Sequence, residues 1–264
     1  MWKTVGLLFV ISLNALLINK AILQYRVIKI PTYMIGLIFI ILSLPLTHLE
    51  KHWGVTISIS LITLTYIELI KLSDSLNIKK TIFKTGFFIG LLTMINYNFG
   101  WFYPMIILSL IYYSQFNWRH FFIQSIGFCY PFVIYYSLYL SNYELSHNPF
   151  KLDASFDQLQ YYFYNYNLFL FLIFIILILS MIELYKNYYR KKENAKKAFN
   201  ILIIFIVLIA LKSILLNTFK FSYLLILPIT IIISNYLIYT KHQKFRTFLL
   251  GLLFISFILN FFYL

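Results

Sequence analysis

Long apolar runs separated by short basic clusters constrain this chain more than any other feature of its sequence. The runs are about 15–20 residues long. A helix that rises ~1.5 Å per residue needs ~20 residues to cross ~30 Å of hydrocarbon. Charged residues make up only 11% of the chain, whereas a soluble domain carries roughly 25% to cover its surface. A soluble enzyme, a secreted disulfide scaffold and a disordered tail are therefore excluded, and a multi-span membrane protein is predicted.

The apolar runs predict an all-α fold: a polytopic transmembrane helical bundle of about 10 spans, forming a single domain over residues 1–264 with no soluble domain. The predicted spans are residues 4–19, 30–47, 55–70, 82–97, 101–113, 121–140, 167–184, 199–216, 221–239 and 248–264. The fourth and fifth runs are short and lie close together. If the segment from Ile82 to Tyr113 is instead one re-entrant hairpin, eight full spans remain.

The charges of the loops predict the orientation of the chain. The five odd-numbered loops carry a net charge of +15 and the four even-numbered loops a net charge of −1. Because Lys and Arg are enriched in cytoplasmic loops, the odd-numbered loops are expected on the cytoplasmic side. Both chain ends would then lie outside. An outer amino terminus beginning Met-Trp-Lys raises the expectation of a further span upstream.

The placement of the basic residues also bears on partners. The chain has 22 Lys and Arg against 8 Asp and Glu, but they lie in short clusters between spans rather than on one face of a folded domain. Nucleic acid is therefore not a predicted partner, whereas the lipid bilayer is. The largest cluster, from Lys186 to Lys197, is a candidate contact for anionic lipid or for an envelope protein. The lone Cys129 gives no disulfide or metal–thiolate site, and no cofactor or metal is predicted.

The second loop holds the densest group of titratable residues, with Glu50 between His48 and His52. A carboxylate flanked by two imidazoles can act as a general base or hold a divalent metal. The spacing is not that of a zinc-binding HExxH helix. Glu50 is therefore the candidate catalytic residue, and a short hydrated turn is the alternative interpretation.

Two other loops supply candidate ligand-binding residues. Asp153 and Asp157 are four residues apart and would share one face of an interfacial helix. The aromatic stretch 161–166 that follows suits a sugar face or an isoprenoid chain, and equally an interfacial aromatic belt. Lys212 and Lys220 lie on the predicted outer side, where an ammonium suits a lipid phosphate. Simple extension of the Lys212 stem to the interface is the alternative.

Small and polar residues are few within the apolar runs. Gly86 and Gly90 form a GxxxG pair, a pattern that permits close approach of two helix backbones. Helix packing is therefore their predicted role. The sparse polar residues include Asn14, Gln124 and Asn235.

Several stretches of apolar and aromatic residues resemble a known family. They are residues 73–83, 86–91, 117–119, 126–132, 227–229 and 233–236. Together they resemble an uncharacterised family of multi-pass inner-membrane proteins from flavobacteria and related Bacteroidota, over most of the chain from about Asn14. The resemblance implies a location in the bacterial inner membrane and no established activity. Members usually start with a basic amino terminus and one more span, which agrees with the orientation inferred from charge.

Three classes of function remain open. The first is an enzymatic role in envelope glycan or lipid-linked sugar handling, with Glu50 as the catalytic carboxylate and Lys212 or Lys220 holding a polyprenyl phosphate. The second is a non-enzymatic scaffold subunit of an envelope machine, which contacts its partner through the loop from Lys186 to Lys197. The third is a small-solute transporter, which the absence of an evident internal repeat disfavours.

Overall fold

The computed structural model describes residues 2–45, 53–73, 77–141, 167–216, 222–240 and 243–262. All regular structure in these residues is helical, which confirms the all-α prediction. The α-helices are α1 (Trp2–Gln24), α2 (Met34–Ser43), α3 (Trp53–Lys71), α4 (Ile78–Ile95), α5 (Tyr103–Tyr112), α6 (Trp118–Ser141), α8 (Asn167–Asn187), α9 (Glu193–Leu216), α10 (Ile226–Tyr239) and α11 (Gln243–Phe262). Three 3-10 helices accompany them: η2 (Tyr97–Phe102), η4 (Tyr188–Arg190) and η5 (Ser222–Leu225).

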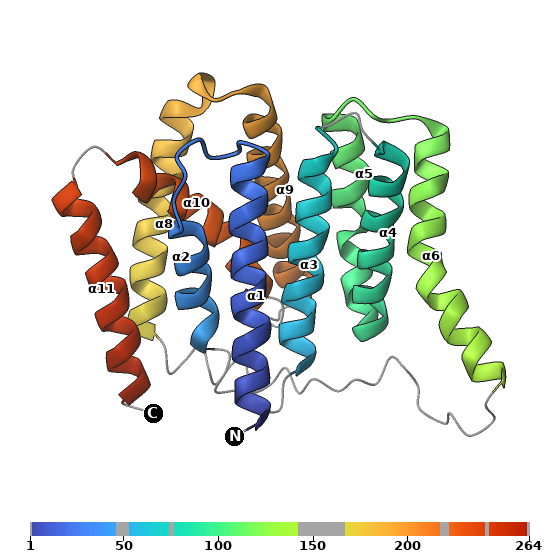
Figure 1. Ribbon diagram of the computed structural model, residues 1–264, viewed down its shortest axis with the longest axis horizontal. Helices are drawn as coiled ribbons and strands as arrows, with labels where there is room; N and C mark the ends of the chain where they lie inside the picture. The colour runs from blue at the N-terminus through green and yellow to red at the C-terminus, as the bar shows by residue number, and fades with distance from the viewer. Residues whose placement is uncertain are drawn as a thin grey trace.

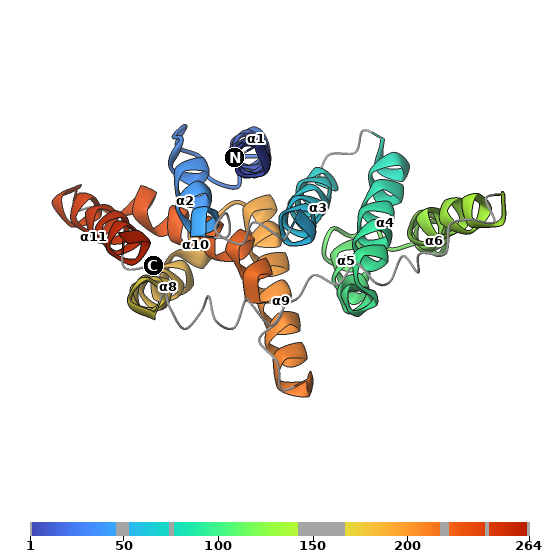
Figure 2. The same ribbon diagram turned by 90° about the horizontal axis from the view of Figure 1, so that it is seen from below.

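Consecutive helices run in opposite directions, so the chain passes up and down through an elongated bundle (Figure 1). The view from below shows α11 at one edge of the bundle and α6 at the other (Figure 2). The α1–α2, α5–α6 and α8–α9 connections lie at the same end, opposite to the two chain termini. These connections are the first, fifth and seventh predicted loops. Three loops predicted to share one side of the membrane therefore share one end of the bundle.

Within the described residues, five helices are long and apolar enough to cross a membrane: α1, α3, α6, α8 and α9. In contrast, α2 has 10 residues and α10 has 14. At ~1.5 Å per residue these helices reach about 15 and 21 Å, short of the ~30 Å hydrocarbon core. The described residues thus form a helical bundle with five candidate spans, and a crossing by about ten spans stays a prediction.

The second predicted span differs from the helix that forms. The sequence predicts a span over residues 30–47, whereas the helix covers only Met34–Ser43. Pro45 explains its early end, because proline has no backbone N–H and so cannot donate to the carbonyl oxygen of Ile41 to continue the helix. An apolar run therefore overstates the length of a helix when a proline lies inside it.

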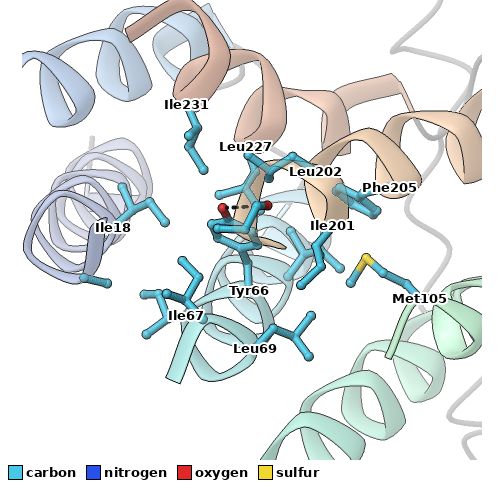
Figure 3. Packing of buried hydrophobic residues seen from close by; sticks show 14 of the residues in the cluster. Ile18, Tyr66, Ile67, Leu69, Met105, Ile201, Leu202, Phe205, Leu227 and Ile231 are labelled. Atoms are coloured by element: carbon cyan, nitrogen blue, oxygen red, sulfur yellow. Dashed lines mark hydrogen bonds between the residues drawn. The ribbon is translucent and has the colours of Figure 1, made fainter. Parts of the chain in front are cut away.

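The main apolar core surrounds α3. Tyr66 of α3 donates its hydroxyl hydrogen to the carbonyl oxygen of Ala198 in α9, at 3.3 Å (Figure 3). Fully buried apolar side chains from α1, α9 and α10 surround this contact: Ile18, Ile201, Leu202, Phe205, Leu227 and Ile231. Because Ala198 lies in the second turn of α9, the contact holds the start of α9 against α3.

A second apolar cluster joins α2, α8, α10 and α11. Its buried members include Ile38, Phe169, Ile176, Ile233 and Leu253. This cluster packs α8 beside α10, and α10 beside α2. The two clusters together bring the ends of α1, α8 and α10 around one cavity.

The glycine pair of α4 is a helix-packing site, as the sequence predicts, and the structure shows that its partner is α6. A Cβ atom on Gly86 would overlap the carbonyl oxygen of Gln124 and lie 3.0 Å from the backbone nitrogen of Phe128. Gly90 faces the carbonyl oxygen of Phe128 in the same way, and Gly127 makes the reciprocal approach from α6. The two backbones are therefore closer than side chains would allow.

Candidate functional site

A cavity of about 640 Å³ lies between the α1–α2 connection, the α8–α9 connection and the end of α10. We call it the basic pocket. Its basic lining residues are Arg26, Lys29, Lys186, Arg190, Lys191 and Lys192. Its acidic lining residue is Glu183. The cavity is therefore strongly positive.

None of these six basic residues forms an ion pair within the part of the chain that the structure describes. The ion pairs of that part are Glu68 with Lys71, Glu68 with Lys84, and Glu193 with Lys197. The carboxylate of Glu183 accepts a hydrogen bond from Nδ2 of Asn187 instead. The pocket thus concentrates positive charge that no described carboxylate neutralises by direct contact.

Arg26 reaches the pocket because α1 ends in a left-handed turn. The φ angle of Arg26 is 54°. The N–H of Val27 donates to the carbonyl oxygen of Ile22 at 3.0 Å, and the N–H of Arg26 donates to that of Leu23 at 3.1 Å. In this Schellman arrangement the left-handed residue is usually glycine, and another residue there costs ~1–2 kcal/mol. Arginine therefore occupies this position at a cost to stability, and such positions cluster at binding sites.

Lys191 projects from the α8–α9 connection into the pocket wall. Its Nζ donates to Oδ1 of Asn235 in α10 at 2.7 Å. The same nitrogen lies 4.5 Å from the ring centroid of Phe199 and 5.3 Å from that of Tyr239. The ammonium is thus held by one neutral hydrogen-bond acceptor and two aromatic faces.

The pKa of Lys191 reflects this environment. Burial lowers it to about 8, the positive charge of Lys29 acts in the same direction, and Glu183 opposes them. An anion bound near Lys191 would stabilise the charged ammonium and raise its pKa again. A perturbed pKa within a cavity is typical of a functional site.

A hydrogen bond from a backbone N–H to a side-chain hydroxyl joins two walls of the pocket. The N–H of Lys29 donates to the hydroxyl oxygen of Tyr239 at 3.1 Å, which joins the α1–α2 connection to the end of α10. Asn235, Tyr236 and Thr240 of the same region add neutral hydrogen-bonding groups to the lining. The site therefore combines a fixed frame with mixed cationic and neutral donors.

This set of groups is chemically suited to an anion with several oxygens. A guanidinium offers parallel N–H donors to phosphate, and an ammonium acts as a point charge. Metal binding has less support, because no group of three His, Cys, Asp or Glu residues that could hold an ion occurs among the described residues. Phosphate is accordingly the ligand group that the lining fits best.

Of the candidate catalytic and ligand-binding residues predicted from the sequence, Lys212 is the one within the described residues, and it does not line this pocket. The other four lie outside the described residues: Glu50, Asp153, Asp157 and Lys220. Lys212 lies in α9, is 4% exposed and donates to the carbonyl oxygen of Asn98. The ring centroids of Phe99 and Phe102 lie 6.0 and 5.8 Å from its Nζ. Lys212 is thus enclosed against η2 and does not extend to the surface.

The sequence indicates part of the pocket but not its assembly. The cluster from Lys186 to Lys197 is visible as a candidate contact, yet nothing local shows that Arg26 and Asn235 lie beside it. Asn235 is the best signal, because it is one of the few polar residues within an apolar run. Its hydrogen-bond partner across the pocket, Lys191, can be identified only from the packed helices.

Comparison with protein families gives a match over residues 2–264 to one described as a family of unknown function (DUF6427). Comparisons with curated proteins and with solved structures give no match. The expectation that the chain belongs to an uncharacterised family is thereby confirmed, and the match extends over nearly the whole chain. The protein belongs to the DUF6427 family.

Proposed function

We propose that the protein binds the phosphate group of an anionic membrane lipid in the basic pocket. One observation carries the proposal: six basic residues surround a cavity of about 640 Å³, and none is ion-paired within the described residues. A bound phosphate would relieve the mutual repulsion of these cations and restore the full charge of Lys191.

The position of the pocket favours a lipid as the source of the phosphate. α8 and α9 are each long and apolar enough to cross a membrane, and the connection between them lines the pocket. Where both helices cross, their connection lies at the level of the lipid headgroups. Each Lys or Arg near an anionic membrane surface contributes ~1 kcal/mol of attraction, so six around one cavity favour anionic over neutral lipids.

The proposed location is the bacterial inner membrane, with the basic pocket on the cytoplasmic side. The charge difference between odd-numbered and even-numbered loops supports this orientation. The common end shared by the α1–α2, α5–α6 and α8–α9 connections supports it as well.

A separate proposal is a role in envelope glycan or lipid-linked sugar handling, with a polyprenyl phosphate held on the predicted outer side rather than in the basic pocket. Glu50 would then supply the catalytic carboxylate. The other contacts to phosphate or sugar would come from Lys212, Lys220, Asp153 and Asp157. A deletion strain is expected to accumulate a lipid-linked sugar, measured by mass spectrometry of envelope lipids. Full complementation by a Glu50→Gln variant would remove Glu50 as the catalyst.

A non-enzymatic scaffold is the second candidate, favoured by exposed side chains on the α8–α9 connection. Tyr189 is 83% exposed, and Arg190 and Lys192 are exposed beside it. These residues are accessible to a protein partner as well as to lipid. Replacing the segment from Lys186 to Lys197 should then abolish co-purification of a partner while the protein remains inserted.

The direct test of the lipid proposal is a binding measurement on the purified full-length protein in neutral detergent. The wild type is expected to bind phosphatidylglycerol at least tenfold more tightly than phosphatidylcholine. The double variant Arg190→Gln/Lys192→Gln removes two exposed pocket charges, so its affinity for phosphatidylglycerol should fall about tenfold or more.

The matched control is the double variant Arg119→Gln/Lys80→Gln, which removes two exposed charges away from the pocket lining. Its affinity should remain within about twofold of the wild type. Equal losses in both double variants would show nonspecific attraction by net charge, and no loss in either would overturn the proposed site.

A further inference from the structure

Of the described residues that line the basic pocket, six are cationic and one, Glu183, carries a carboxylate. Glu183 lies in α8, four residues before the end of that helix at Asn187. Residues four apart share one face of a helix, and both of these line the pocket. Phosphate binding accounts for the six cations, but a carboxylate in the same cavity repels phosphate. Glu183 therefore needs an explanation of its own.

The carboxylate of Glu183 is held in place but only partly used as an acceptor. Nδ2 of Asn187 donates to its Oε1. It forms no ion pair with a described cation, although it is near enough to Lys191 to act against the lowering of that ammonium's pKa. A carboxylate offers about four lone-pair positions on its two oxygens. Glu183 thus keeps capacity for a further donor, while Asn187 fixes its orientation.

A ligand in the pocket changes the surroundings of this carboxylate. Glu183 is half-buried, so solvent reaches it while the cavity is open. A ligand that fills the cavity excludes that solvent, and a charged group left without replacement donors is costly. A phosphodiester group carries only acceptors and is itself negative, so it cannot take the place of the lost water. The ligand that fits best therefore carries a hydrogen-bond donor beside its phosphate.

The cations of the pocket distinguish between the two kinds of donor that lipid headgroups carry, a hydroxyl group and an ammonium group. An ammonium near Glu183 would also lie near the Nζ of Lys191 and among five further positive groups, which repel it. A hydroxyl group adds no positive charge. Its hydrogen bond to a carboxylate is charge-assisted and is stronger than a bond between two neutral groups. The lining thus favours a hydroxylated headgroup.

We propose that Glu183 selects an anionic phospholipid whose headgroup is a polyol, by accepting a hydrogen bond from a headgroup hydroxyl while the cations bind the phosphate. The inference rests on the proposed function and specifies its ligand as a phosphodiester of glycerol or a similar polyol. Asn187 acts as a positioning residue for the carboxylate. Glu183 also disfavours phosphodiesters without a hydroxyl, because they leave its negative charge facing theirs.

The test compares lipids that share their acyl chains but differ in headgroup, bound to the purified full-length protein in neutral detergent. Phosphatidylmethanol has the same charge as phosphatidylglycerol and no headgroup hydroxyl. The wild type should bind phosphatidylglycerol at least about fivefold more tightly than phosphatidylmethanol, as expected for one charge-assisted hydrogen bond. Phosphatidylethanolamine should also bind at least about fivefold more weakly. Binding of phosphatidylethanolamine as tight as that of phosphatidylglycerol would make the donor an ammonium and overturn the polyol class.

Two variants separate the acceptor role of Glu183 from its charge. Glu183→Leu removes both, so the preference for phosphatidylglycerol should fall below about twofold while the affinity for phosphatidylmethanol rises, because the repulsion is gone. Glu183→Gln keeps a neutral acceptor and should retain an intermediate preference. A purely structural role would instead lower the affinity for both lipids in parallel, and that result would overturn the assignment. An undiminished preference in Glu183→Leu would overturn it as well.

Glu193→Gln is the matched control. Glu193 is exposed at the start of α9, on the far side of the same connection, and does not line the pocket. The variant removes one negative charge and should keep the wild-type preference for phosphatidylglycerol over phosphatidylmethanol within about twofold. An equal loss of preference in Glu193→Gln and Glu183→Leu would show an effect of net charge and contradict selection by Glu183.

The water-soluble headgroup glycerophosphoglycerol identifies the source of the polyol phosphate. It should bind at least about tenfold more weakly than phosphatidylglycerol, because it has no acyl chains to bury. Equal affinity would assign the site to a soluble phosphodiester and overturn the lipid as its ligand.

The remaining outcomes separate this inference from the proposed function. If the wild type prefers phosphatidylglycerol over phosphatidylcholine but binds phosphatidylmethanol equally well, the assignment of Glu183 is wrong and the proposed function stands. If the wild type does not prefer phosphatidylglycerol or phosphatidylmethanol over phosphatidylcholine, the proposed function fails and the assignment of Glu183 fails with it.

Discussion

Two residues of the basic pocket are held in conditions that their own chemistry disfavours. Arg26 takes a left-handed backbone conformation that is usually left to glycine. Lys191 carries its charge in a site where burial and the charge of Lys29 lower its pKa to about 8. Both residues place positive groups around one cavity, and a bound anion would lower the electrostatic penalty at Lys191. Arg26 and Lys191 are therefore the strongest support for an anionic ligand.

Lipid binding should weaken as the pH rises through 8. Lys191 then loses its proton in the lipid-free protein, whereas a bound phosphate raises its pKa and keeps it charged. Affinity should therefore be nearly constant below pH 7.5 and fall by up to tenfold per unit above pH 8. Dissociation constants for phosphatidylglycerol between pH 6.5 and 9.5 measure this effect. Lys191→Gln should bind more weakly and lose this pH dependence, and a flat wild-type profile would contradict the role of Lys191.

At the scale of the elements, close backbone contact replaces side-chain packing where α4 meets α6. The GxxxG pair of Gly86 and Gly90 predicts such a contact from sequence alone, and the structure supplies its partner, the segment of α6 around Gly127. Local patterns of this kind are predictable because they depend on few residues. The partner helix is not predictable in the same way, because small residues fit many neighbours.

Gly86→Ala should destabilise the bundle, because the new Cβ would overlap the carbonyl oxygen of Gln124, which is backbone and cannot rotate away. Overpacking of this kind costs ~1–3 kcal/mol. Gly251→Ala in α11 is the matched control, since no atom lies within 4 Å of its added Cβ. Thermal unfolding in detergent should show a clear loss for Gly86→Ala and none for Gly251→Ala. Equal melting temperatures would contradict the close contact.

Apolar runs in the sequence predict that a helix forms but not how long it is. The runs predict helices correctly, but α2 stops before Pro45, and the run 221–239 begins with η5 before α10. Hydropathy measures how apolar a run is and not how much of it is regular helix. The basic pocket is not predictable from these runs either. Arg26, Lys191 and Asn235 come from three separate segments, and only the packed bundle brings them together.

At the scale of the whole molecule, charge and topology agree. The alternation of apolar runs with basic clusters predicts that odd-numbered loops share one side, and three of these connections lie at one end of the bundle. This arrangement is predictable because each loop charge constrains one crossing independently. The site is predicted only in part, since the sequence points to Lys212 and the outer loops as well as to the cluster from Lys186 to Lys197.

Cysteine labelling in intact cells checks the proposed orientation. In a Cys129→Ser background, Lys192→Cys reports on the basic end, and Tyr97→Cys reports on the opposite end, where η2 joins α4 to α5. A membrane-impermeant maleimide should label Tyr97→Cys in spheroplasts and Lys192→Cys only after permeabilisation. The reverse pattern would place the basic pocket on the outer side and contradict the proposal.

The most direct measurement is photo-crosslinking with an anionic phospholipid that carries a diazirine in its headgroup, followed by peptide mass spectrometry. The wild-type protein in bilayer nanodiscs should crosslink within residues 26–29, 183–192 and 235–240, which line the basic pocket. Excess phosphatidylglycerol should suppress these crosslinks, and excess phosphatidylcholine should not. Crosslinks spread over lipid-exposed faces such as that of α6, with none at the pocket segments, would contradict an anionic lipid site in the basic pocket.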